Sequence, residues 1–171
     1  MIVGVSSHWS ASKGLYDYYK LRELLPADQF VVVLVGITSE QKNNIPDGII
    51  GVERTENLDE LALIYSAADV VTSLSYQETF GLTIVEGVAC GTPAVVYDNT
   101  ALPELVDSDT GLVVETGNME RLAEAIRQVC KTGKSFYSQA CREVAQTRYD
   151  KFCQYEKYVE LYEQALVPKK V

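Results

Sequence analysis

The sequence predicts an α/β fold: a doubly wound, Rossmann-like parallel sheet of about six strands, followed by C-terminal helices. Three observations predict it. Short runs of β-branched and other apolar residues recur along the chain, as in strands that are buried on both faces. Segments with helical spacing separate these runs without long linkers. From Asn118 onward the pattern becomes wholly helical.

The elements are predicted in order from these patterns. Strands are expected at residues 2–5, 30–35, 49–52, 69–74, 93–97 and 111–114. Helices are expected at residues 15–25, 58–65, 82–89, 102–106, 119–132, 135–148 and 150–166. Pro26, Gly91 with Pro93, and Gly133 supply stop signals for three of these helices. The polar stretch 38–47 is assigned no element.

Helical spacing also predicts which faces are buried. Asn57 is expected to cap the helix at 58–65, with Glu60 three residues on as in a capping box. The expected apolar faces are Leu58, Leu61, Ala62 and Tyr65 in that helix, and Leu82, Val85, Val88 and Ala89 in the helix at 82–89. A stripe in the last helix is expected to belong to the core: Tyr155, Tyr158, Val159 and Tyr162.

Composition narrows the class of protein. At 171 residues, with 47% hydrophobic and 23% charged residues, the chain is expected to be one soluble globular domain, residues 1–171. No apolar run approaches the length of a membrane span and no signal peptide is recognised, so a cytoplasmic location is expected. Peripheral contact with the inner face of a membrane stays open.

Net charge and cysteine usage exclude further classes. A net charge of −9 works against binding a phosphate backbone, so nucleic acid is not expected as a partner. The four cysteines form no Cys-x-x-Cys pair, and each falls within or at the end of a predicted helix, where buried thiols are common: Cys90, Cys130, Cys141 and Cys153. They are predicted to be reduced and structural, without a metal or redox role.

The stretch from Tyr76 to Pro93 is the most informative part of the chain. It joins two predicted strands through a loop and a helix, and such a loop lies at the carboxyl edge of the sheet, where open α/β folds bind ligands. The first-turn amides after Gly81 form a site for an anion, and glycine there would let a ligand approach the backbone. Glu86 lies roughly 6 Å along the axis from Leu82. A diphosphate at the helix start would therefore place its ribose near Glu86.

The same stretch contains a recognisable motif, a Glu-x7-Glu segment that ends in Gly-x-Pro, with Glu78, Phe80, Gly81, Glu86, Gly91 and Pro93. At these residues it resembles the nucleotide-binding half of retaining glycosyltransferases of the two-domain GT-B type, family four. Flanking matches follow the family's order at Ala68-Asp69, Pro103-Glu104, Gly111 and Gly117.

The resemblance implies roles for individual residues. It makes Glu78 the catalytic contact to the donor sugar's hydroxyls, and Glu86 the acceptor of the ribose hydroxyls. It pairs Lys13, of Lys13-Gly14, with the diphosphate. His8 stands where the family usually has an arginine, so either His8 donates to phosphate, or Ser7 and the loop amides do. The donor site is completed by Phe80, Gly81, Leu82 and Thr83.

The family's chemistry is expected to need no metal or other cofactor. The sequence Asp107-Ser108-Asp109 is similar to a metal-binding acidic triplet, but Asp and Ser are common turn formers, and a turn is the preferred interpretation. No Gly-x-Gly-x-x-Gly follows a predicted strand and no Walker lysine loop is present, so neither a dinucleotide cofactor nor a P-loop is expected.

The resemblance spans residues 2 to about 166 but covers one half of a two-domain enzyme. It implies a C-terminal donor-binding half that lacks the N-terminal acceptor-binding domain and is inactive alone. The expected ligand is a nucleotide-diphosphate sugar, a UDP-sugar, in glycan, polysaccharide or glycoconjugate biosynthesis. Two alternatives stay open: a sugar-nucleotide epimerase half, disfavoured by the single histidine, and a non-catalytic binding or regulatory module, disfavoured by the presence of both glutamates.

Overall fold

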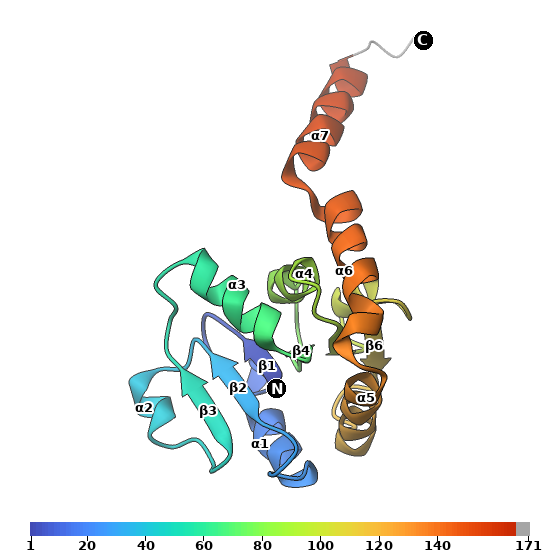
Figure 1. The fold of residues 1–171 in the computed structure, drawn as a ribbon. Helices are drawn as coiled ribbons and strands as arrows, with labels where there is room; N and C mark the ends of the chain where they lie inside the picture. Colours follow the sequence, from blue (N-terminus) through green and yellow to red (C-terminus); the bar gives the residue numbers. More distant parts are fainter. Residues whose placement is uncertain (167–171) are drawn as a thin grey trace.

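The computed structural model describes residues 1–166 and confirms the predicted fold class (Figure 1). One six-stranded sheet has the order β3-β2-β1-β4-β5-β6, and every pair of neighbouring strands is parallel. The strands are β1 Ile2–Val5, β2 Val32–Val35, β3 Ile49–Val52, β4 Val70–Ser73, β5 Ala94–Tyr97 and β6 Gly111–Val114. From β1 the strands β2 and β3 are added on one side of the sheet. The chain then returns to place β4 on the other side of β1, followed by β5 and β6, so the topological switch point lies between β1 and β4.

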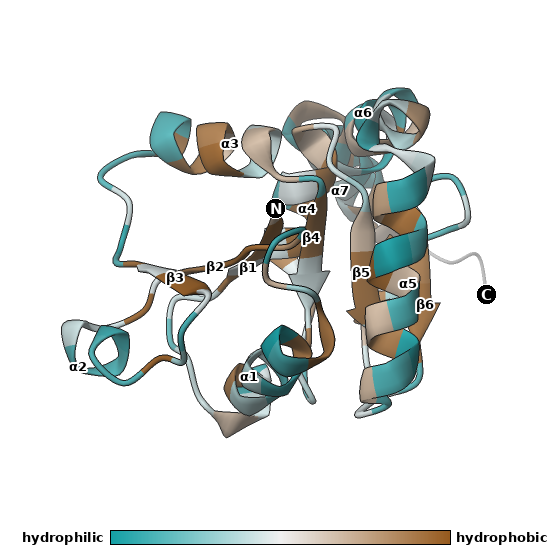
Figure 2. Cartoon of the chain, turned by 60° about the horizontal axis from the view of Figure 1, so that its bottom comes forward, coloured by the Kyte–Doolittle hydropathy of each residue, from teal (hydrophilic) through white to brown (hydrophobic). Residues whose placement is uncertain are grey.

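Helices cover both faces of the sheet (Figure 2). One face carries α3 Leu58–Ala67, α4 Leu82–Ala89 and α6 Lys134–Tyr149, and the other carries α1 Leu15–Leu24 and α5 Met119–Thr132. The short elements are η1 Ala11–Lys13, α2 Ser39–Lys42 and η2 Leu102–Leu105, and the last helix is α7 Lys151–Leu166. The strands β2, β4 and β5 are buried at every position, as their apolar runs predict.

Buried tyrosines tie the helices to the central strands. The Tyr18 hydroxyl of α1 donates to the carbonyl oxygen of Thr72 in β4 at 2.8 Å, and the Thr72 hydroxyl donates to Tyr18 at 3.0 Å. A Cβ on Gly4 of β1 would lie 2.6 Å from the Tyr18 ring, so this strand position must be small. These contacts fix α1, and the loop before it, against the edge where β1 and β4 end.

Two local features differ from the sequence prediction. The stretch assigned no element contains α2, which Thr38 and Gln41 begin with a capping box; its four polar residues offer no apolar face to detect. The predicted faces of α3 and α4 are partly wrong, because Leu58, Leu82 and Ala89 are exposed. The buried side of α4 is Ile84, Gly87 and Val88. A Cβ on Gly87 would lie 2.7 Å from Val71, so the helix approaches β4 too closely for a larger residue.

The aromatic stripe of the last helix is not part of the core, contrary to prediction. Its members Tyr155, Tyr158, Val159 and Tyr162 are 61%, 57%, 55% and 64% exposed. The helix α7 follows α6 and extends away from the sheet (Figure 1), so within residues 1–166 its stripe has no core to join. Of the cysteines, Cys153 on the same helix is likewise exposed, Cys90 and Cys130 are half-buried, and Cys141 is buried. None of the helices in the described part of the chain is long and apolar enough to cross a membrane.

Candidate functional site

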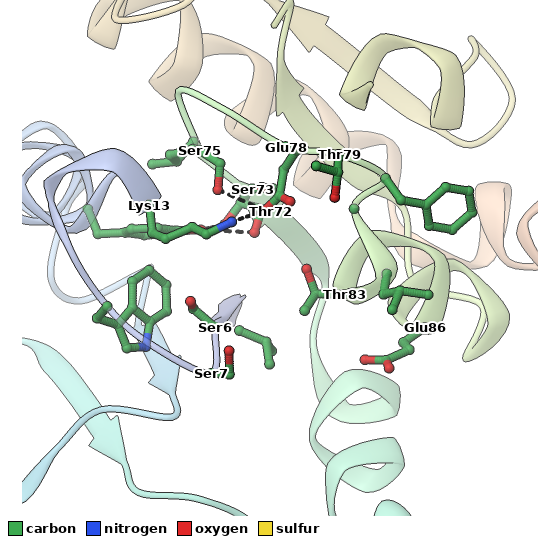
Figure 3. Close-up of a pocket in the computed structure, with 17 residues that line it drawn as sticks. Ser6, Ser7, Lys13, Thr72, Ser73, Ser75, Glu78, Thr79, Thr83 and Glu86 are labelled. Carbon is green, nitrogen blue, oxygen red and sulfur yellow. Dashed lines mark hydrogen bonds and ion pairs between the residues drawn. The ribbon is translucent and has the colours of Figure 1, made fainter. Parts of the chain in front are cut away.

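A crevice of about 330 Å³ opens at the topological switch point. Its walls are the ends of β1 and β4, with residues 5–7 on one side and 72–75 on the other, together with Lys13 and the segment 78–83. Figure 3 shows Ser6 and Ser7 across the opening from Thr83 and Glu86. The carboxyl ends of parallel strands meet at one edge of a sheet, and this crevice is the place where such folds bind ligands.

Lys13 and Glu78 meet inside the crevice. The Lys13 ammonium donates to Oε1 of Glu78 at 2.6 Å, and the Ser75 hydroxyl donates to the same oxygen at 3.1 Å. The side chains are 32% and 18% exposed, respectively, so the ion pair is partly shielded from water. Lys13, the residue predicted to bind the diphosphate, is thus in direct contact with Glu78, the residue predicted to bind the sugar (Figure 3).

The position of Lys13 depends on the glycine after it. Gly14 has a φ of 72° and a Cβ there would lie 2.2 Å from the carbonyl oxygen of Leu74. Only glycine fits such a left-handed turn packed on backbone. The Lys13-Gly14 pair therefore docks the loop after β1 onto the end of β4, which carries the lysine into the crevice.

The N-terminus of α4 faces the same crevice. Gly81 begins the helix with a φ of 94° and its carbonyl accepts the first helical hydrogen bonds, from Ile84 and Val85. The amides that come before these two donors at the start of α4 have no hydrogen-bond partner within the helix, which makes this end a site for an anion. The φ of Gly81 favours glycine, and a Cβ there would also lie 2.8 Å from the end of the Leu105 side chain of η2, which would have to shift.

Glu86 is half-buried on α4, one turn beyond the helix start. The Tyr65 hydroxyl of α3 donates to Oε2 of Glu86 at 3.0 Å. Burial raises the pKa of Tyr65 well above its ordinary value, and the charge of Glu86 raises it further. Tyr65 therefore stays protonated at neutral pH and holds one carboxylate oxygen. The helical spacing of Tyr65 correctly predicts a core residue but does not reveal this contact.

A second cavity, of about 820 Å³, adjoins the first. It is lined by residues 36–39 after β2 and residues 53–58 after β3, and it shares Ser6, Ser7, Thr83 and Glu86 with the crevice. Glu86 therefore lies where the two cavities meet. Neither loop is among the residues predicted for the site, although each follows a predicted parallel strand and so reaches the same edge of the sheet.

The other residues predicted to bind the donor differ in where they lie relative to the crevice. Phe80 and Leu82 line the crevice and are 43% and 64% exposed, and Phe80 also packs edge-to-face against Tyr149 of α6. His8 is exposed and is not among the residues that line either cavity. Its main chain is bonded to the Ser6 hydroxyl. Of the two candidates to replace the family's arginine, Ser7 lies at the crevice, and a role for His8 in phosphate binding stays a prediction.

The acidic turn at 107–109 has a structural role in its fold. The Asp107 carboxylate accepts from the Asp109 amide at 3.1 Å and from the Thr110 hydroxyl at 3.0 Å, which closes the turn before β6. Within residues 1–166, no group of three or more His, Cys, Asp and Glu side chains is arranged to hold a metal ion.

Comparison with known proteins identifies the family to which the chain belongs. The family profile described as "Glycosyl transferases group 1" matches residues 2–132, which contain every strand and the whole crevice. The chain belongs to this family of glycosyltransferases. The predicted family relationship is thereby confirmed, at the level of group 1.

Curated relatives of this glycosyltransferase chain match it over part of their length. The D-inositol 3-phosphate glycosyltransferase of Corynebacterium aurimucosum is 37% identical over 123 residues, which are 64% of this chain and 29% of that protein. The enzyme of the same name from Mycobacteroides abscessus is 42% identical over 88 residues, 51% of this chain and 20% of that protein. The matched segments thus span less than a third of these relatives.

Solved structures share the fold over nearly the whole chain. Sucrose-phosphate synthase from Thermosynechococcus elongatus superposes with a TM-score of 0.81 at 26% identity, covering 96% of this chain and 45% of that one. Anabaena HepE in complex with UDP gives a TM-score of 0.81 at 23% identity, covering 95% and 48%, and this likeness concerns the fold alone. The chain thus spans about half the length of each.

Proposed function

We propose that the crevice binds a UDP-sugar and that the chain is the donor-binding half of a retaining glycosyltransferase. The observation that carries this proposal is the convergence of Lys13, Glu78, the α4 N-terminus and Glu86 on one crevice at the switch point of the sheet. A cation and a helix start suit a diphosphate, whereas carboxylates suit the hydroxyls of a ribose and a sugar.

The order of these groups fits the order of parts in the ligand. The diphosphate lies between Lys13 and the amides from Gly81 to Thr83. The ribose lies against Glu86, whose carboxylate accepts from both ribose hydroxyls. The base then enters the second cavity, because Glu86 stands where the two cavities meet. The hexose lies at the opposite end, beside Glu78.

The same groups support the chemistry of transfer. Charge develops on the diphosphate as the sugar leaves, and fixed amides together with Lys13 stabilise that charge without a metal ion. Glu78 holds the donor sugar by its hydroxyls near the reacting carbon. An acceptor must also be held at reacting distance. An N-terminal domain outside this chain is proposed to supply that surface, so no product is expected from the chain alone.

Uridine is proposed as the nucleoside. HepE, which shares the fold, was solved with UDP and with UDP-glucose. A mycobacterial relative that is 39% identical over 69 residues is named as GDP-mannose-dependent. Affinity for GDP is therefore the comparison that tests the choice of base.

Calorimetric titration of the chain with UDP, GDP and uridine tests the proposal. We expect binding of UDP in the micromolar range or weaker, retained in EDTA. Glu86→Ala should weaken UDP binding by about 1.5–3 kcal/mol, roughly 10- to 150-fold, the range for hydrogen bonds to a charged group. Glu120→Ala, an exposed glutamate on α5, is the matched control. Unchanged affinity in folded Glu86→Ala would contradict the ribose assignment, and a strict need for magnesium would contradict metal independence.

A further inference from the structure

Thr100 has an unusual backbone conformation beside the crevice. In residues 1–166 it is the one non-glycine residue with a positive φ, 51°. A β-branched side chain in the left-handed region is rare and strained. Thr100 is also exposed, so burial of its side chain does not offset the strain. Strain of this kind persists only where neighbouring contacts hold it, and it gathers at functional sites.

Thr100 and its neighbour Asn99 form hydrogen bonds with the loop that carries Glu78. The Thr100 hydroxyl accepts a hydrogen bond from the backbone amide of Glu78 at 2.9 Å. The side-chain amide of Asn99 donates to the carbonyl oxygen of Tyr76. Two consecutive residues after β5 thus fasten two positions of the loop after β4.

The opposite side of this loop is fastened independently. The Tyr76 amide donates to the carbonyl oxygen of Ser12 at 2.8 Å. The Tyr76 hydroxyl donates at 2.7 Å to Asp17, a buried carboxylate that also accepts from Tyr97 at 3.0 Å. Tyr76 is therefore held from both sides. The backbone of Glu78, two residues on, is held by Thr100.

We infer that Thr100 is a positioning residue: its strained backbone aims the hydroxyl at the Glu78 amide and so fixes how the Glu78 carboxylate meets Lys13 and the donor sugar. The link to the sugar rests on the proposed function. The link to the Glu78 backbone rests on the hydrogen bond alone. The two links can therefore be tested separately.

Three substitutions separate the hydroxyl from the strain. Thr100→Val keeps the branched shape and the strain but lacks the hydroxyl. Thr100→Ser keeps the hydroxyl. Thr100→Gly lacks the hydroxyl and removes the strain. Because the site is exposed, all three are expected to fold, and Thr100→Gly should melt roughly 2–4 °C or more above Thr100→Val.

The first measurement needs no ligand. Amide hydrogen exchange by NMR should be faster at Glu78 by roughly tenfold in Thr100→Val and Thr100→Gly than in the wild type. Thr100→Ser should stay close to the wild type. The amide of Tyr76, bonded to Ser12, is the internal control and should not change. Unchanged exchange at Glu78 in Thr100→Val would overturn the inference.

The second measurement compares UDP with UDP-glucose by calorimetry. The valine and glycine variants should keep the affinity for UDP within about twofold and lose the extra affinity that the glucose provides in the wild type, whereas Thr100→Ser should keep both. Equal losses for the two ligands would overturn the positioning role and indicate a general structural one. A wild-type chain that binds neither ligand would contradict the proposed function, while exchange at Glu78 would still decide whether Thr100 positions it.

Discussion

The ion pair between Lys13 and Glu78 leads to an unexpected prediction for a proposed active-site glutamate: removing its charge should increase the affinity for UDP. In the absence of ligand the Lys13 ammonium lies 2.6 Å from Oε1 of Glu78, so a diphosphate must share this lysine with a carboxylate. Glu78→Gln removes the competing charge and keeps the size of the side chain. We therefore expect the variant to bind UDP more tightly than the wild type does.

The magnitude follows from the exposure of the pair. With Lys13 32% exposed and Glu78 18% exposed, the pair is partly shielded, but solvent still screens part of the attraction. Exposed or partly exposed pairs contribute about 0.2–1 kcal/mol. When the lysine no longer has to be shared with the carboxylate, UDP binding should thus tighten by roughly 1.4- to fivefold. The loss of a negative charge beside the diphosphate acts in the same direction.

Calorimetry with UDP, uridine and UDP-glucose measures the effect. Uridine, which carries no phosphate, should bind the variant as it binds the wild type, and UDP-glucose should lose its advantage over UDP. Glu120→Gln is the matched control. In the background Lys13→Ala, the substitution Glu78→Gln should have a smaller effect, because the lysine for which the two anions compete is gone. Weaker UDP binding in folded Glu78→Gln would refute the competition.

Three further predictions concern single contacts. Lys13→Ala should weaken UDP binding far more than uridine binding, since only UDP carries the diphosphate; equal losses would point to misfolding. Tyr65→Phe removes the hydrogen bond to Glu86 and should weaken UDP and uridine equally, by about 0.5–1.5 kcal/mol; a loss confined to UDP would contradict the ribose role of Glu86. Gly81→Ala should lower the free energy of unfolding by about 1–3 kcal/mol in urea titration, because of the φ of 94° and the contact with Leu105; a neutral effect would show that the turn is not constrained.

Much of this architecture could be predicted from local patterns. The β-branched runs at each strand are long enough to reveal a buried parallel sheet, and all six predicted strands exist. Lys13, Glu78 and Glu86 come together because each follows or flanks a strand end at the carboxyl edge. That consequence of parallel topology can be derived before any coordinates are seen.

Other features depend on which segments meet in three dimensions. Lys13 and Glu78 are 65 residues apart, and Tyr65 and Glu86 are 21 apart, so neither contact has a local signal. The aromatic stripe of α7 has helical periodicity, which identifies one face of a helix but not what covers it. The strain at Thr100 likewise follows from contacts between two loops, not from its neighbours in the chain.

A two-dimensional NMR titration with UDP tests the central claim most directly, because it locates the ligand on the chain. If the crevice binds UDP as proposed, the largest amide shift changes fall at Ser6, Ser7 and Lys13, at Gly81 to Thr83 and around Glu86. Residues 36–39 and 53–58 also shift, and uridine produces these changes too. Shift changes concentrated on α5, α6 or α7, or none at millimolar UDP, would contradict this claim.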